Sequence, residues 1–116
     1  MERLPVERSD AAQMSRQLNR QARAALTKGD LVEATRLLRE AIRTFPLLEV
    51  NYNDLGVICW QSGEGKRALS LFRQAVRINP SFDDARRNLH DAAQALGCEE
   101  GVESLMPEPT NKEGEP

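Results

Sequence analysis

The 116-residue chain is poor in the residues that usually mark catalytic, metal-binding or disulfide-stabilised proteins. It has one histidine, two cysteines and only 4% aromatic residues. One histidine and two cysteines supply too few ligands for an ordinary structural zinc site, and two distant cysteines do not make the dense framework of a small secreted domain. Seven glycines and six prolines exclude a collagen-like or low-complexity chain. We therefore expect neither a metal nor another cofactor.

The sequence also lacks a long apolar run and a large excess of one charge. Its first eight residues are charged and have no apolar core, unlike a secretory signal, and no apolar run approaches the ~20 residues of a membrane span. Sixteen basic side chains against 18 acidic ones give a formal net charge of −2. Such a balance favours neither nucleic acid nor a membrane surface as a partner. We expect a cytoplasmic protein.

Charge is distributed unevenly along the chain. Residues 97–116 carry six acidic side chains and one basic side chain, whereas residues 49–96 carry six of each. The segment 98–116 is rich in Glu and Pro and nearly free of large apolar groups, which is typical of a disordered tail. Two interpretations of this acidic tail stay open. It is either a solubilising extension or a segment that folds back onto Arg16, Arg20 and Arg23.

A repeat of 34 residues is the strongest pattern in the sequence. When residues 15–48 are aligned with residues 49–82, eight positions are identical, whereas unrelated segments would share roughly two. The matches include glycine and proline, which helical periodicity alone does not require. The identical pairs are Asn19/Asn53, Gly29/Gly63, Ala34/Ala68, Leu37/Leu71, Arg39/Arg73, Ala41/Ala75, Arg43/Arg77 and Pro46/Pro80.

Each unit has the pattern of two helices joined by a tight turn. In the first unit, apolar residues at helical spacing stop before Gly29, which can take the left-handed conformation that ends a helix. Asp30 is a candidate N-cap and forms a capping-box pattern with Glu33. A second apolar stripe at helical spacing runs until Pro46, which cannot continue a helix. The second unit repeats this plan and ends at Pro80.

A fifth helix follows, with Ser81 as candidate N-cap and Gly97 as its end. The first helix is expected to begin near Ser9 or Asp10 and to reach about Thr27. The sequence therefore predicts an all-α fold of about five helices, an α-solenoid of antiparallel helix-turn-helix repeats. The expected segments are a flexible N-terminus (1–9), a helical domain (10–97) with repeat 1 (about 15–48), repeat 2 (about 49–82) and a capping helix (about 83–96), and the tail (98–116).

The two units resemble the tetratricopeptide repeat over about residues 15–97. The resemblance implies a curved stack of helix pairs in which the first helix of each repeat lines a concave groove. Two repeats and a cap are fewer than the usual three, so we expect the long first helix or a second copy of the chain to supply further burial. The first unit is degenerate, with Gln21 where Leu is usual. The second unit matches the pattern at Tyr52, Leu55, Gly56, Ala68, Phe72, Ala75 and Pro80 and departs from it at Cys59.

The resemblance implies that the groove binds a peptide or helix of a partner protein. Its cationic end and apolar middle suit an extended acidic ligand with an apolar anchor, and Asn53 is expected to bond the backbone of that ligand. The carboxylate clamp of some family members is not expected, because Arg23 and Asp54 stand where that clamp needs asparagine. The groove residues implied are Arg16, Asn19, Arg23, Leu26, Val50, Asn53, Val57, Trp60, Gln61, Arg87, Asp91 and Gln94, with Arg20 one position off the stripe.

Each of these residues also has a purely structural interpretation. Trp60 can cover the neighbouring helix, and the arginines can form an ordinary solvated face. A catalytic interpretation has little support, since His90 is the single histidine and Asp91 points about 100° away from it on a helix. The segment from Gly63 to Lys66 lacks the spacing of a phosphate-binding loop.

The leading hypothesis is a scaffold or adaptor without catalysis that binds an unidentified protein or peptide. Three alternatives stay open. The chain could self-associate as a homodimer, bind RNA through its arginine-bearing first helix, or serve as an accessory subunit of a larger and possibly enzymatic complex. Binding to RNA predicts a steep loss of affinity with added salt, and the acidic tail argues against it.

Overall fold

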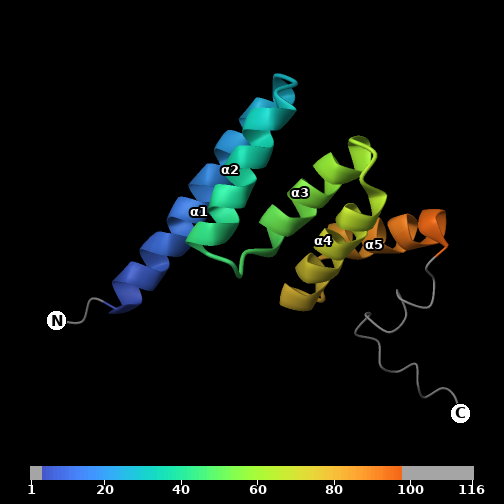
Figure 1. Cartoon of the computed structure of the whole chain (residues 1–116). Coiled ribbons are helices and arrows are strands. Elements are labelled where there is room, and N and C mark those ends of the chain that lie inside the picture. Colours follow the sequence, from blue (N-terminus) through green and yellow to red (C-terminus); the bar gives the residue numbers. More distant parts are fainter. Residues whose placement is uncertain (1–3, 98–116) are drawn as a thin grey trace, which may run out of the picture.

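The computed structural model describes residues 4–97, which form five α-helices and no strand. Neighbouring helices in the chain pack against one another and run antiparallel within each hairpin (Figure 1). The all-α solenoid predicted from the sequence is therefore confirmed. The helices are α1 (Leu4–Thr27), α2 (Leu31–Thr44), α3 (Glu49–Gln61), α4 (Gly65–Ile78) and α5 (Asp83–Leu96).

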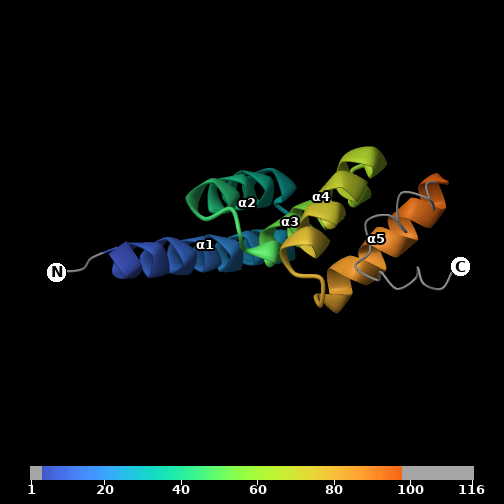
Figure 2. The same ribbon diagram turned by 90° about the horizontal axis from the view of Figure 1, so that it is seen from below.

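The helices build a thin stack of 53 × 40 × 17 Å. α1 and α2 form the first hairpin, α3 and α4 form the second, and α5 packs on α4 at the far end from the N-terminus (Figure 1). Seen from below, α2 and α4 lie on one side of the stack and α1 and α5 on the other (Figure 2). None of the described helices combines the length and the hydropathy that crossing a lipid bilayer requires.

The core consists of two hydrophobic clusters, each built from three consecutive helices. Small alanines let the helices approach closely, and Leu, Ile or Phe fills the space between them. α3 contributes to both clusters and so connects the two repeats. The first cluster contains Ala22, Ala25, Ala34, Leu37, Leu38, Leu55 and Ile58, and the second contains Cys59, Ala68, Leu69, Phe72, Ala75, Val76, Ala85, Leu89, Ala92 and Ala93.

Gly56 sets the spacing between α3 and α4. A Cβ built at this position would lie 2.5 Å from Phe72 Cε1 and 2.8 Å from Phe72 Cδ1. Real Cβ atoms do not approach so closely, so any side chain here would displace the Phe72 ring. The glycine of the repeat pattern is therefore required by packing.

The turns inside the hairpins largely follow the prediction. Gly29 and Gly63 have φ of +82° and +83°, the left-handed conformation that ends a helix at low steric cost only in glycine. Asp30 is the N-cap of α2, and its Oδ1 accepts a hydrogen bond from the Glu33 backbone N–H at 3.1 Å. The other half of the predicted capping box is wrong, because the Glu33 carboxylate bonds Arg36 at 2.8 Å.

Two helix starts differ from the prediction. α5 is capped by Phe82 without a side-chain hydrogen bond, because the Ser81 N–H donates to Asn79 Oδ1 at 3.1 Å and Ser81 belongs to the preceding turn. α1 begins at Leu4 and not near Ser9, so residues 4–9 are helical where a flexible N-terminus was expected. Pro5 does not oppose this start, since proline suits the first turn of a helix. Residues 1–3 and the acidic tail lie outside the described residues.

α1 is longer than its partner helix, with 24 residues against 14 in α2, and its N-terminal part extends beyond the end of α2 (Figure 1). The apolar side chains that α1 adds to the core lie in its second half, from Leu18 to Leu26. Met14 is 58% exposed. No described apolar side chain of α1 before Leu18 belongs to either core cluster, so among the described residues this part of α1 does not supply the further burial expected from the sequence.

Candidate functional site

A recess of about 550 Å³ lies between α1 and the segment that joins α2 to α3. α1 contributes cationic side chains spaced one turn apart, and the joining segment contributes apolar ones. This surface, here called the arginine recess, therefore combines two kinds of binding chemistry. It is lined by Ala12, Arg16, Asn19, Arg20, Arg23, Phe45, Leu47, Leu48, Glu49 and Val50.

The three arginines of this recess differ in their partners. Arg23 Nε lies 3.1 Å from Asp54 Oδ2 on α3. Arg16 and Arg20 are exposed and form no ion pair with another described residue. The Glu49 carboxylate, which also lines the recess, accepts a hydrogen bond from Asn79 Nδ2 at 3.2 Å. The free cationic charge of the recess therefore resides on Arg16 and Arg20.

A buried hydrogen-bonded network connects α1 with α2 and α3 behind the recess. Ser15 Oγ donates to the Ala41 carbonyl at 2.9 Å and accepts from Asn51 Nδ2 at 2.9 Å. Asn19 Nδ2 donates to Asn51 Oδ1 at 3.0 Å and to Asp54 Oδ2 at 2.9 Å. Ser15 and Asn51 are fully buried, so these bonds replace the water that both groups lose on folding. The network holds the first helices of the two repeats in register.

The same contact recurs at the next junction. Asn53 Oδ1 on α3 accepts from Asn88 Nδ2 on α5 at 2.9 Å, and these residues are 35 positions apart, as are Asn19 and Asp54. Asn19 uses Nδ2 for two bonds inside the protein, so both of its amide hydrogens are engaged. Asn53 is only 6% exposed, but its Nδ2 has no partner among the described residues. A bond from Asn53 to a ligand backbone stays a prediction.

A second, smaller cavity of about 210 Å³ lies between α3 and α5. The Trp60 side chain lines this cavity and is 40% exposed. A Cβ built at Gly65 would lie 3.2 Å from Trp60 Cζ3 and 3.3 Å from Leu96 Cδ2, so the indole also covers the start of α4. This cavity, here called the Trp60 pocket, is lined by Val57, Trp60, Gln61, Phe72, Asn88, Asp91 and Ala92.

Most groove residues named from the sequence line one of these two hollows. Arg16, Asn19, Arg23 and Val50 line the arginine recess, and Val57, Trp60, Gln61 and Asp91 line the Trp60 pocket. Asn53, Leu26, Arg87 and Gln94 line neither hollow, and Asn53 instead bonds Asn88. Leu26 packs against the first core cluster, Arg87 is exposed with its Nη1 3.7 Å from Asp84 Oδ1, and Gln94 is exposed outside both hollows.

Sequence reasoning missed Asn51 and Asn88 and the apolar side chains between α2 and α3. The repeat could have indicated Asn88, because it stands 34 residues after Asp54. Asp54 bonds Asn19, and Asn88 bonds Asn53, and each pair is 35 residues apart. Asn51 has no counterpart at the shift of 34, where the first unit has Gln17 and the fifth helix has Ala85. Its role follows only from the approach of α1 to α3.

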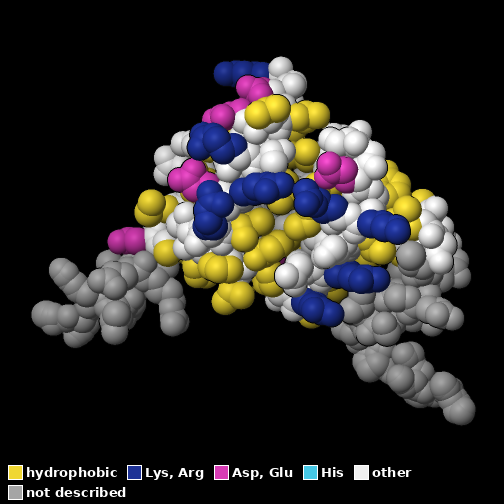
Figure 3. All heavy atoms as spheres, in the orientation of Figure 1, with side chains coloured by type: hydrophobic (Ala, Val, Ile, Leu, Met, Phe, Trp, Pro, Cys, Tyr) yellow, Lys and Arg dark blue, Asp and Glu magenta, His cyan; other side chains and the backbone are white. Residues whose placement is uncertain are grey.

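The face formed by α2 and α4 carries a band of Lys and Arg side chains with apolar side chains between them (Figure 3). Several of these cations are engaged in ion pairs. Arg36 lies 2.8 Å from Glu33 and 3.4 Å from Glu40, and Arg67 lies 3.6 Å from Glu64. Exposed pairs of this kind contribute little to stability. They lower the free charge that this face offers to a ligand.

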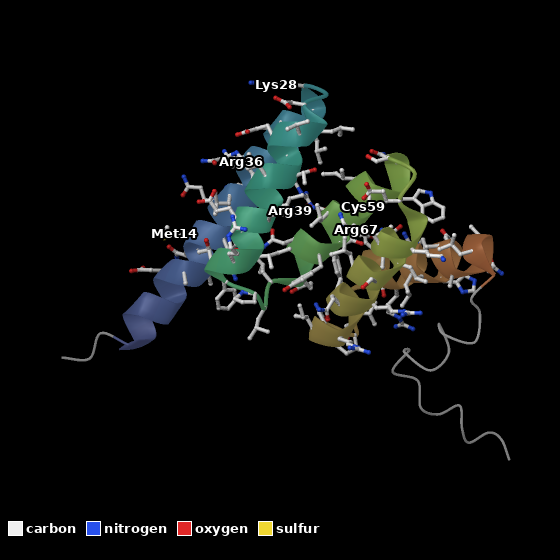
Figure 4. All side chains as sticks on the ribbon, in the orientation of Figure 1. Met14, Lys28, Arg36, Arg39, Cys59 and Arg67 are labelled. Carbon is white, nitrogen blue, oxygen red and sulfur yellow. The ribbon has the colours of Figure 1, made fainter. Side chains whose placement is uncertain are left out.

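Cys59 is a buried free thiol near Arg39 and Arg67 (Figure 4). Burial raises the pKa of this thiol, and the Glu64 carboxylate raises it further, against smaller opposing effects of the two arginines. The thiol therefore keeps its proton and is a poor nucleophile. Within residues 4–97, no three His, Cys, Asp or Glu side chains gather where they could share a metal ion.

Comparison with known proteins gives short similarities. No family model matches this chain. It is 31% identical over 72 residues to the peroxisomal targeting signal receptor of Saccharomyces cerevisiae and 33% identical over 69 residues to that of Kluyveromyces lactis. These segments cover 62% and 59% of this chain but 12% of each receptor. A segment of 57 residues is 35% identical to part of protein arginine N-methyltransferase 9 of Mus musculus. This segment covers 49% of this chain and 7% of that enzyme.

Proposed function

We propose that the chain is a protein-interaction module that holds an extended segment of a partner protein along α1, α3 and α5. The observation that carries this proposal is the arrangement of two hollows on these helices, the arginine recess and the Trp60 pocket. Arg16 and Arg20 offer charge-assisted hydrogen bonds at one end, and Trp60 offers apolar area at the other. No covalent bond changes in this function.

The comparisons support a binding role. Two relatives are named as receptors for a targeting signal, and a receptor acts by binding. The third is named a methyltransferase, but the similar segment is 7% of that protein. In the chain itself, His90 is exposed and Cys59 keeps its proton, so neither is prepared as a nucleophile or base.

Selection of peptides on the full chain tests this proposal. A random peptide library displayed on phage is selected against the full chain, and the affinities of the selected peptides are measured by fluorescence polarisation. We expect Trp60→Ala to weaken them about tenfold or more, as loss of a buried aromatic anchor does. Val32→Ala is the matched control, because Val32 is an exposed apolar residue (83%) that lines neither hollow.

Asn53→Ala and Arg16→Ala extend the test to the rest of the groove. Both variants should weaken the same peptides, with circular dichroism showing that each variant is folded. If no peptide is selected, or if all selected peptides bind the groove variants as tightly as the parent chain, the proposal is wrong.

Self-association is a second candidate function, favoured by an exposed apolar side chain on α1. Met14 is 58% exposed, and pairing with a second α1 would cover it. Sedimentation across concentration distinguishes the two functions. Self-association predicts a dimer that Met14→Glu disrupts, and a strict monomer at high micromolar concentration contradicts it.

A further inference from the structure

The Trp60 pocket differs in chemistry from the arginine recess at the other end of the groove. Its floor is apolar, formed by Val57, Phe72 and Ala92, and its polar side chains are one carboxylate, two amides and the indole of Trp60. None of the described residues that line it is Lys, Arg or His. We infer that this pocket takes a Lys or Arg side chain of the bound segment, an inference that rests on the proposed function.

The carboxylate of the pocket is available to a ligand. Asp91 is exposed on α5 and pairs with no cation among the described residues. Arg87 stands one helical turn before it, but the Arg87 guanidinium lies 3.7 Å from Asp84. Asp91 thus brings a negative charge without a described cation partner to a cavity that the Trp60 indole also lines.

The amide of Asn88 adds an acceptor to this carboxylate. Its Nδ2 donates one hydrogen to Asn53 Oδ1 at 2.9 Å, so Asn88 still offers its Oδ1, which accepts hydrogen bonds, and one amide hydrogen. An ammonium or guanidinium group carries only donors, whereas a carboxylate carries only acceptors. Because the one charged side chain among the described lining residues is the Asp91 carboxylate, the charge of the pocket favours a cation over an anion.

The size and the floor of the pocket fit a single long side chain. A cavity of about 210 Å³ is below the about 300–1,000 Å³ of typical small-molecule sites. Lys and Arg carry apolar stems that pack on apolar surface while their charged ends stay near water or an acceptor. The stem can lie on Val57 and Phe72, and the charged end can reach Asp91 and the π-face of Trp60.

A purely apolar anchor, which the sequence analysis favoured, fits the pocket less well. A Leu or norleucine side chain would fill the floor but would remove water from the Asp91 carboxylate without replacing its hydrogen bonds. A cation replaces them. With Arg16 and Arg20 at the other end, the bound segment would have an acidic residue toward α1 and a basic residue toward α5.

The test uses the peptides selected on the full chain. We expect the groove-dependent peptides to contain Lys or Arg at one common position, and replacement of that residue by norleucine to weaken binding about tenfold. In the Asp91→Asn variant the cationic peptide should lose about two- to fivefold in affinity, while the norleucine peptide should bind as before. The chain has one tryptophan, so quenching of its fluorescence reports occupancy of this pocket directly.

Asp83→Asn is the matched control, because it removes the same charge from the same helix at a residue outside the pocket. Asp91→Lys should reverse the preference toward peptides with Glu at the common position. The inference is overturned, while the proposed function stands, if groove-dependent peptides carry an apolar or acidic residue there or if Asp91→Asn weakens both peptides equally. The absence of any groove-dependent peptide would overturn both.

Discussion

Arg23 and Asp54 form an ion pair between α1 and α3, with Nε and Oδ2 3.1 Å apart. In the sequence analysis, the resemblance implied that both residues stand where a carboxylate clamp needs asparagine. Because Arg23 and Asp54 face each other in space, the positive charge of Arg23 and the negative charge of Asp54 compensate each other. Asp54 also accepts from Asn19, so it belongs to the buried network as well as to the groove surface. The pair is therefore a contact between the first helices of the two hairpins.

The two members of this pair should contribute unequally to stability. Asp54→Ala should lower the free energy of unfolding by about 1–3 kcal/mol, because Asn19 Nδ2 loses a charged acceptor in a partly buried place. Arg23→Ala should lower it by less than about 1 kcal/mol, since the Arg23 side chain is 58% exposed and such pairs contribute little. Urea denaturation of both single variants and the double variant measures these values. Equal losses in the two single variants would contradict the prediction.

Ser15→Ala should cost more than its small size suggests. The substitution leaves the Ala41 carbonyl and Asn51 Nδ2 buried without the hydroxyl that bonds both. An unsatisfied buried polar group costs about 1–3 kcal/mol, and denaturation in urea should show a loss of that size. Ser70→Ala, an exposed serine on α4, is the control and should change stability by less than about 0.5 kcal/mol. A similar effect of both substitutions would argue against the network.

Gly56→Ala should destabilise the fold by about 1–3 kcal/mol, the usual cost of overpacking a core. Alanine favours a helix over glycine, so a loss of stability can come only from the clash with Phe72. Thermal denaturation provides the measurement, and Phe72→Leu provides the rescue. If the clash is real, Gly56→Ala should cost less in the Phe72→Leu background than in the parent chain. An unchanged cost there would show that the ring is not the obstacle.

The Cys59 thiol predicts a dependence of stability on pH. Because burial raises its pKa in the folded chain, the thiol ionises more readily after unfolding. The folded state should therefore be favoured below the ordinary thiol pKa of about 8.5 and should lose stability as the pH rises through the higher folded value. Urea denaturation at pH values from below the ordinary thiol pKa to above the folded pKa, in a Cys98→Ala background, measures this change in the free energy of unfolding. Cys59→Ala should abolish this contribution, and rapid alkylation of Cys59 in the folded chain would contradict it.

Much of the fold is readable from short-range chemistry. Gly29 and Gly63 interrupt two apolar stripes because only glycine takes their backbone conformation without strain, and Pro46 and Pro80 follow the ends of the helices because proline has no N–H to donate. The start of α5 was harder to predict. Ser81 and Phe82 are both possible starts, and the choice depends on the bond from Ser81 to Asn79.

The candidate site was predictable in its helices but not in its contacts. A shift of 34 residues placed Arg16, Asn53 and Trp60 on the first helices of their repeats, since periodicity assigns residues to a helix face. It could not show that Asn53 would bond Asn88, or that Phe45 and Leu48 would complete the arginine recess. Their roles as ligand contacts stay predictions.

Backbone propensity and apolar spacing act over a few residues, so the linear order of amino acids was sufficient for five helices, their turns and a repeated stack. Which polar side chains meet depends on how closely the packed helices approach one another. The donor–acceptor distances are 2.9–3.1 Å for the bonds that join Asn19 to Asn51, Asn19 to Asp54, and Arg23 to Asp54. The small alanines of the first core cluster allow that approach of α1 to α3. Only the packed chain therefore decided that Arg23 faces Asp54 and that Asp91 lies in the Trp60 pocket without a cation partner among the described residues.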